Sequence, residues 1–203
     1  MGVLLLGTSA SPGGAQEPVA DLSLDLLGGV TVPVGDAAKV AGTGPLLAIG
    51  LNHRINERFS LTTEFHHSEL TRSGRRIVEA TDIQLSRASL GVELRLLSPG
   101  SRWQVGSRIG AGLTRVGTNP TRSLPGTGFN VFNITKINTD AFSLTGGIQV
   151  GRRLGGLTPF LRTQLELHFV GSNLGVLRGV DQSISESGPI IGVPVQFGLR
   201  FRL

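Results

Sequence analysis

Along most of the chain, apolar residues alternate with small or polar residues at a period of two. This pattern predicts β-strands with one apolar and one polar face, because successive side chains of a strand point to opposite sides. Upstream of the fourth segment, Ile83 and Leu85 fall on the opposite parity, which predicts a bulge near Ser86 or Arg87. The alternation occurs in eight segments, at residues 21–34, 47–54, 58–66, 88–96, 103–114, 142–150, 161–169 and 191–203.

The segments and their connections both point to a membrane barrel. Most segments are about as long as the ~9–11 residues that a tilted strand needs to cross a bilayer. Short links at residues 55–57, 98–101 and 154–156 alternate with long links at residues 35–44, 69–82, 117–140 and 171–188. Short turns at one end and long loops at the other are typical of outer-membrane barrels. The sequence therefore predicts an all-β fold, an eight-stranded antiparallel up-and-down transmembrane β-barrel.

A soluble barrel or sandwich would show the same alternation, so the content of each face decides between them. The polar face is rich in glycine, serine and threonine, with isolated charges of both signs. Such a face suits a narrow lumen better than a solvated exterior. The apolar face carries no charge between the strand ends, as a lipid-facing wall requires. The membrane barrel is the favoured interpretation.

The composition agrees with one barrel and excludes several other classes of protein. Charged residues make up 16% of the 203 residues, below the ~25% of soluble domains. There is no cysteine, which excludes disulfides and thiolate chemistry, and the longest apolar run, residues 3–6, is too short for a membrane helix. The net charge of +5 comes almost wholly from arginine. No nucleic-acid-binding motif accompanies it, so we expect no nucleic-acid partner.

The first residues resemble the end of an export signal. Gly13 and Ala15 occupy the −3 and −1 positions of a possible signal-peptidase site before Gln16. We therefore expect residues 1–19 to be a remnant signal peptide or a flexible tail, and residues 20–203 to form the barrel domain.

The last segment resembles the C-terminal β-signal of bacterial outer-membrane proteins. Apolar residues stand at every second position in residues 195–203, and the signal residues are Phe197, Leu199, Phe201 and Leu203. The sequence departs from the family in ending on leucine, where phenylalanine is usual. Residues 28–36 also look like the first strand of the OmpA-like and Ail/OmpX-like small barrels. The resemblance implies a bacterial outer-membrane location with both termini periplasmic, and the barrel assembly machinery as a partner.

Aromatic residues are expected to form two girdles at the membrane interfaces. With both termini on the periplasmic side, Phe59, Trp103 and Phe201 fall near one rim. Phe65, Phe142 and Phe169 fall toward the other. The alternative is that these phenylalanines are scattered because strands favour them.

Charged residues of the polar face are expected to meet inside the lumen, because eight strands leave an interior that side chains just fill. Unpaired charges are costly there, so a mutually neutralising network is predicted. Such a network is either a plug, which we favour, or a gate or proton path. Arg200 and Arg202 lie level with Asp21 and Asp25 and are expected to pair where the barrel closes. The predicted network comprises Glu64, Glu93, Arg95, Arg108, Arg162 and Glu166.

Catalytic, metal and cofactor sites are not expected. His66 and Ser68 superficially resemble the His-x-Ser pair of outer-membrane lipid A deacylases. They differ from it in lying far from the C-terminus and in pointing inward. The four histidines lack a second ligand at useful strand spacing, although His66 and His168 could meet in the lumen.

The long links are the expected sites of interaction, because exposed loops on a rigid scaffold carry function. Phe129 and Phe132 in the third long link could contact a surface partner. Arg72, Arg75 and Arg76 in the second are expected to meet lipopolysaccharide phosphates. The sequence thus predicts a non-enzymatic outer-membrane protein with a structural or surface-interaction role. The alternatives are a narrow channel for ions or small solutes and, behind it, a lipid A-modifying hydrolase.

Overall fold

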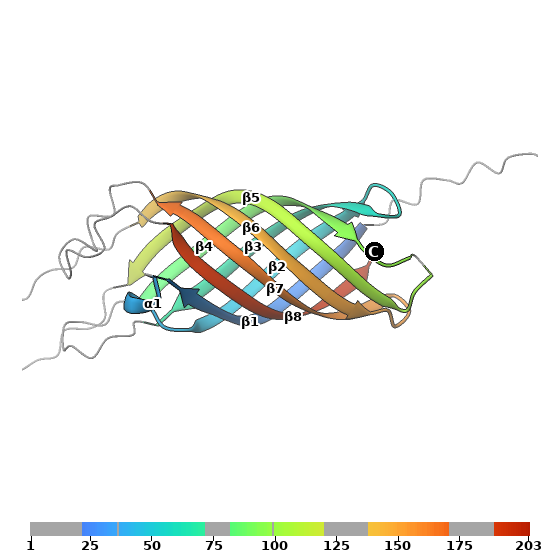
Figure 1. Cartoon of the computed structure of the whole chain (residues 1–203), viewed down its shortest axis with the longest axis horizontal. Coiled ribbons are helices and arrows are strands. Elements are labelled where there is room, and N and C mark those ends of the chain that lie inside the picture. The colour runs from blue at the N-terminus through green and yellow to red at the C-terminus, as the bar shows by residue number, and fades with distance from the viewer. Residues whose placement is uncertain (1–21, 36, 72–81, 99, 120–137, 171–188) are drawn as a thin grey trace, which may run out of the picture.

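Eight strands close on themselves into a barrel in the computed structural model, which describes residues 22–35, 37–71, 82–98, 100–119, 138–170 and 189–203. Each strand pairs antiparallel with the next, and β8 pairs with β1 (Figure 1). The prediction of an eight-stranded antiparallel up-and-down barrel is confirmed. The strands are β1 (Leu22–Val34), β2 (Gly44–Arg54), β3 (Phe59–Leu70), β4 (Asp82–Arg95), β5 (Trp103–Asn119), β6 (Asn138–Arg152), β7 (Leu157–Val170) and β8 (Ile190–Arg202).

The two ends of the barrel differ, as the link lengths predict. One end, here called the short-turn end, comprises residues 54–59, 95–103, 152–157 and 200–203, and it includes the C-terminus (Figure 1). At the other end, the long-loop end, the short helix α1 (Ala37–Val40) connects β1 to β2. The other three connections at the long-loop end contain residues 72–81, 120–137 and 171–188, which lie outside the described residues.

The barrel wall is apolar outside and polar inside. Leu47, Ile109 and Leu113 point outward and are 67–70% exposed, while the polar residues that alternate with such positions are buried. This distribution is the reverse of that in a soluble barrel and matches a wall that faces lipid. No helix in the described part of the chain is both long and apolar enough to cross a membrane.

The predicted bulge in the fourth strand is wrong. The pairing of β4 with β3 and β5 runs without interruption through Ser86 and Arg87. Leu85 points into the barrel on the same parity as Arg87, so the inward face itself changes from polar to apolar toward the long-loop end. An apolar cluster fills the lumen at this level, formed by Ala41, Leu70, Leu85, Val116 and Ala141 with Ile83 and Val170 packed against it.

One aromatic side chain lies inside the polar part of the lumen. The ring of Phe160 is buried, and the guanidinium carbons of Arg162 and Arg200 lie 5.0 and 5.5 Å from its centre. Such cation–π contacts are strongest where water is excluded. Space for the ring exists because residue 198 on the neighbouring strand is glycine: a Cβ there would overlap the ring of Phe160 at Cζ.

Replacing Gly198 by alanine is therefore expected to destabilise the barrel by about 1–3 kcal/mol, the usual cost of overpacking a filled interior. The ring would have to leave its position against Arg162 and Arg200. The measurement is the urea dependence of unfolding in detergent micelles. Gly146→Ala is the matched control, because a Cβ at Gly146 would meet no atom within 4 Å. Equal stability of the two variants would contradict the packing argument.

Candidate functional site

The centre of the lumen is organised around the carboxylate of Glu64. Its Oε1 accepts a hydrogen bond from Arg87 at 2.9 Å, and its Oε2 accepts from Arg108 at 2.7 Å and from Arg162 at 2.6 Å. The three arginines come from β4, β5 and β7, whereas Glu64 lies on β3. The Glu64 side chain has no exposed surface. The three arginines explain how it can be buried, because a buried carboxylate needs compensating charge and hydrogen bonds.

A second carboxylate, Glu166, lies beside this centre and joins it to two histidines. Arg87 donates to Glu166 as well as to Glu64 and thereby links the two acids. Nδ1 of His66 lies 3.2 Å from Glu166, and Nε2 of His168 lies 3.5 Å from it on the other oxygen. His66 and His168 therefore both lie in the lumen, one on each side of the Glu166 carboxylate. The other ring nitrogen of His168, Nδ1, is 3.0 Å from the hydroxyl of Thr114.

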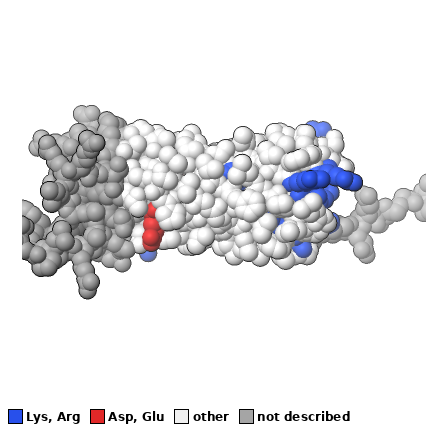
Figure 2. Space-filling view, turned by 90° about the horizontal axis from the view of Figure 1, so that it is seen from below, with Lys and Arg blue, Asp and Glu red and all other residues white. Residues whose placement is uncertain are grey.

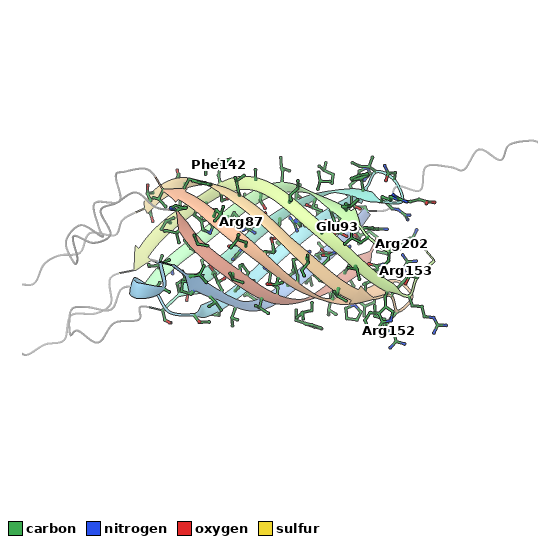
Figure 3. The ribbon with its side chains drawn as sticks, viewed as in Figure 1. Arg87, Glu93, Phe142, Arg152, Arg153 and Arg202 are labelled. Carbon is green, nitrogen blue, oxygen red and sulfur yellow. The ribbon has the colours of Figure 1, made fainter. Side chains whose placement is uncertain are left out.

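Toward the short-turn end, Arg200 is held by two acids. It donates to Asp25 of the adjacent strand β1 at 2.8 and 3.0 Å and to Glu93 of β4 at 3.1 and 2.8 Å. Arg162 also donates to Asp25 at 3.2 Å and so connects this group to the Glu64 centre. Figure 3 shows Arg87 and Glu93 inside the barrel, with Glu93 nearer the short-turn end.

These contacts make one network, here called the lumen network, with four arginines and four carboxylates. The four formal charges of each sign cancel, and none of the eight residues is more than 6% exposed. Members from strands on opposite walls meet directly, so the network crosses the lumen from side to side. The members are Asp25, Glu64, Arg87, Glu93, Arg108, Arg162, Glu166 and Arg200.

The structure brings five of the six expected network residues together in this network, which also contains Arg87, a residue that sequence reasoning missed. The bulge it assumed left the facing of Arg87 undecided, and the unbroken register turns that side chain inward. Arg95, the sixth, forms no ion pair with a described carboxylate. It lies two residues beyond Glu93, where β4 ends at the mouth of the lumen, and so it is out of reach of the mid-barrel acids.

Of the expected closure pairs, Asp25 and Arg200 are hydrogen-bonded across the β1–β8 seam. Arg202 lies opposite Ser23 at the exposed end of this seam. Asp21 lies outside the described residues, and so does its expected pairing with Arg202.

The aromatic residues of the two expected girdles all point outward, and five of the six lie toward the predicted ends of the wall. Phe59 and Trp103 begin their strands at the short-turn end, and Phe201 is the last residue but one of β8 there. Phe142 lies toward the long-loop end (Figure 3). It stacks with Phe169, and the two ring centres are 6.2 Å apart. The placement of Phe65 at that rim is wrong. Strand β3 continues to Leu70, four residues past the predicted segment, so Phe65 lies near its middle.

The residues of the hydrolase alternative point into the lumen. His66 and Ser68 are 1% and 0% exposed, away from the outer wall, where a lipid substrate would lie. Within the described residues, no group of three or more histidine, cysteine, aspartate or glutamate side chains is arranged to hold a metal ion. Outward-facing Phe197, Leu199 and Phe201 lie on β8, and Leu203 follows its end, with its backbone N–H bonded to Leu22 O at 2.9 Å.

The remaining expectations concern residues that the structure does not describe. These are the signal or tail at residues 1–19, the basic group Arg72, Arg75 and Arg76, and the aromatic pair Phe129 and Phe132.

Removing the charge of Glu64 is expected to destabilise the barrel by about 3–5 kcal/mol, because Glu64→Gln removes the one negative charge that three buried guanidinium groups share and leaves the network with an uncompensated positive charge. Glu69→Gln is the matched control on the same strand. The side chain of Glu69 is 49% exposed and contacts only His67 and Gln84 among the described residues, so about 1 kcal/mol or less is expected. Urea unfolding in micelles measures both. A second change, Arg108→Gln, should recover part of the loss, since Glu64 is the only carboxylate in the described part of the chain with which Arg108 forms an ion pair. No recovery would argue against the charge-balance explanation.

Comparisons with known proteins bear on the fold. No protein-family model and no curated protein matches the chain. Among solved structures, Neisserial surface protein A is similar at a TM-score of 0.61 and 10% identity, covering 90% of this chain and 97% of that one. A major outer membrane protein from Thermus thermophilus has a TM-score of 0.55 at 11% identity, with 90% and 99% covered. Ail of Yersinia pestis, solved with the heparin analogue sucrose octasulfate, has a TM-score of 0.53 at 10% identity, again with 90% and 99% covered. The chain therefore has the fold of the small eight-stranded outer-membrane β-barrels.

Proposed function

We propose that this chain is an integral outer-membrane protein without catalytic activity, whose lumen is closed by side chains and whose contacts are made at the long-loop end. The short turns and both ends of the chain face the periplasm. The observation that carries the proposal is the lumen network, in which neutralising side chains from opposite walls meet. Above it, the apolar cluster around Leu85 occupies the long-loop end of the same lumen. A closed interior behind an apolar wall suits a structural or surface-interaction role.

A narrow channel for ions or small solutes is the second candidate. Several buried polar atoms in the lumen network and beside it have no hydrogen-bond partner within the described residues. Buried polar groups are normally satisfied, in many cases by ordered water, so a file of water could pass these positions. They include the hydroxyls of Thr31, Thr62, Ser68 and Ser143, one oxygen of Glu166 and the side-chain nitrogen of Gln196.

A lipid hydrolase is the weakest of the three candidates. A nucleophilic serine has to reach its substrate, and Ser68 is fully buried on the inward face of β3. No observation on the described residues favours this activity, and we do not propose it for this chain.

The partners that fit this proposal are anionic lipid on the outside and the assembly machinery at the end of β8. Ail, a structural neighbour, was solved with a polysulfated heparin analogue. By analogy, we assign to Arg72, Arg75 and Arg76 the binding of lipopolysaccharide phosphates. Phe197, Leu199 and Phe201 form an outward apolar row on β8, as an assembly signal on the last strand requires. A surface protein partner, contacted by Phe129 and Phe132, remains part of the proposal.

The location is tested by fractionation with electrophoresis of unboiled samples. The folded barrel should appear in the outer-membrane fraction and migrate differently before and after boiling, because a closed sheet has no edge at which detergent can begin to open it. A band of unchanged mobility, or a protein found in the soluble or inner-membrane fraction, would overturn the proposal.

Single-channel recording distinguishes a closed lumen from a channel. Purified protein in planar bilayers should give no large, stable conductance steps, since the lumen network crosses the lumen from side to side. The Glu64→Gln and Arg108→Gln double variant serves as a comparison, because it removes one pair without changing the net charge. Stable, ion-selective steps in the unaltered protein would favour the channel instead.

A further inference from the structure

The short-turn end carries far more positive charge than the lumen network uses. Its residues include eight arginines and one acidic residue, Glu57. Figure 2 shows that, on the visible face, the basic side chains gather at this end of an otherwise nearly uncharged wall. Of the eight arginines, only Arg200 belongs to the lumen network.

Five of these arginines line one pocket at the mouth of the lumen. They are Arg54 at the end of β2, Arg95 at the end of β4, Arg153 in the last short turn, and Arg200 and Arg202 on β8. Figure 3 shows Arg153 and Arg202 together at this end, whereas Arg152 lies to one side. The pocket has a volume of about 90 Å³, room for a group larger than one water molecule.

The pocket has a surplus of positive charge. No carboxylate is among its described lining residues. Arg200 has its two counter-charges, Asp25 and Glu93, on the lumen side. Arg54, Arg153 and Arg202 each have an interaction partner as well, so the attraction for an anion comes from the excess of guanidinium groups and not from a free side chain.

The lining also supplies neutral groups that suit an oxyanion. Ser23 and Thr158 contribute hydroxyl groups, and Gln104 contributes an amide. With its amide oxygen turned to Arg153, Gln104 accepts two hydrogen bonds from that guanidinium at 3.2 and 3.3 Å, which fixes its position. Guanidinium groups offer paired N–H donors in the geometry that phosphate oxygens accept.

We propose that this pocket, at the short-turn mouth of the barrel, binds a phosphoryl group through Arg54, Arg95, Arg153 and Arg202. The group is either that of a soluble phosphate compound or that of an anionic phospholipid headgroup reaching over the rim. The lining is the same whichever side of the membrane it faces, so the site is independent of the proposed orientation and of the lumen's conductance.

The test is calorimetric titration of the full chain, folded in zwitterionic micelles, with two probes: pyrophosphate and dihexanoyl phosphatidylglycerol. The pocket variant is Arg54→Gln with Arg153→Gln. The control, Arg58→Gln with Arg152→Gln, removes the same charge from the same end of the barrel but from residues outside the pocket. We expect saturable binding that weakens about tenfold or more in the pocket variant and less than about twofold in the control, since only the pocket variant loses direct charge-assisted hydrogen bonds.

The two probes distinguish the source of the phosphoryl group. Binding of pyrophosphate alone supports a soluble ligand, and binding of the lipid alone supports a headgroup. Equal weakening in both double variants, or no saturable binding of either probe, would overturn the proposal. If the pocket variant does not fold, modification of the unaltered protein by phenylglyoxal gives the answer: the bound probe should protect Arg54 and Arg153 and leave Arg58 reactive. Equal reactivity of all three would also overturn it.

Discussion

The narrow lumen of an eight-stranded barrel forces the charges of its inner wall to neutralise one another directly. Side chains from opposite strands meet there, and no inward charge can keep a full hydration shell. The lumen network meets this constraint with equal numbers of arginines and carboxylates, each within reach of at least one opposite charge. The same constraint explains why residue 198 is glycine. The ring of Phe160 fits against Arg162 and Arg200 because Gly198 has no side chain to occupy that space.

Much of this architecture could be predicted from the sequence because a strand in a barrel wall has only two faces. Alternation fixes which residues point inward, and link length fixes which ends lie together, so the strands and most members of the lumen network follow. The errors arose where the inner face stops being polar. Leu85 points inward, and the pattern was interpreted as a bulge because an inward residue was assumed to be polar. For the same reason, sequence reasoning did not identify Arg87 as an inward-facing residue.

Other features depend on how far along the barrel axis a residue lies, and the alternation of apolar and polar residues does not indicate this position. Arg95 has the correct facing but lies at the mouth, and Phe65 has the correct facing but lies halfway along its strand. The pocket of arginines at the short-turn end escaped sequence reasoning for a related reason. Its members come from the ends of β2, β4 and β8 and from the turn before β7, and only the stagger of neighbouring strands brings these ends to one place.

The seam between β1 and β8 has a consequence for how the barrel forms and how long it lasts. Arg200 and Asp25 are 175 residues apart in the chain, and Arg162 and Asp25 are 137 apart. Contacts so distant carry a large loop-closure entropy, so we expect them to form after the local hairpins. Interactions absent from the transition state slow unfolding without speeding folding. We therefore expect the ion pairs of Asp25 with Arg200 and Arg162 to slow unfolding of the finished barrel and to leave its folding rate to the local hairpins.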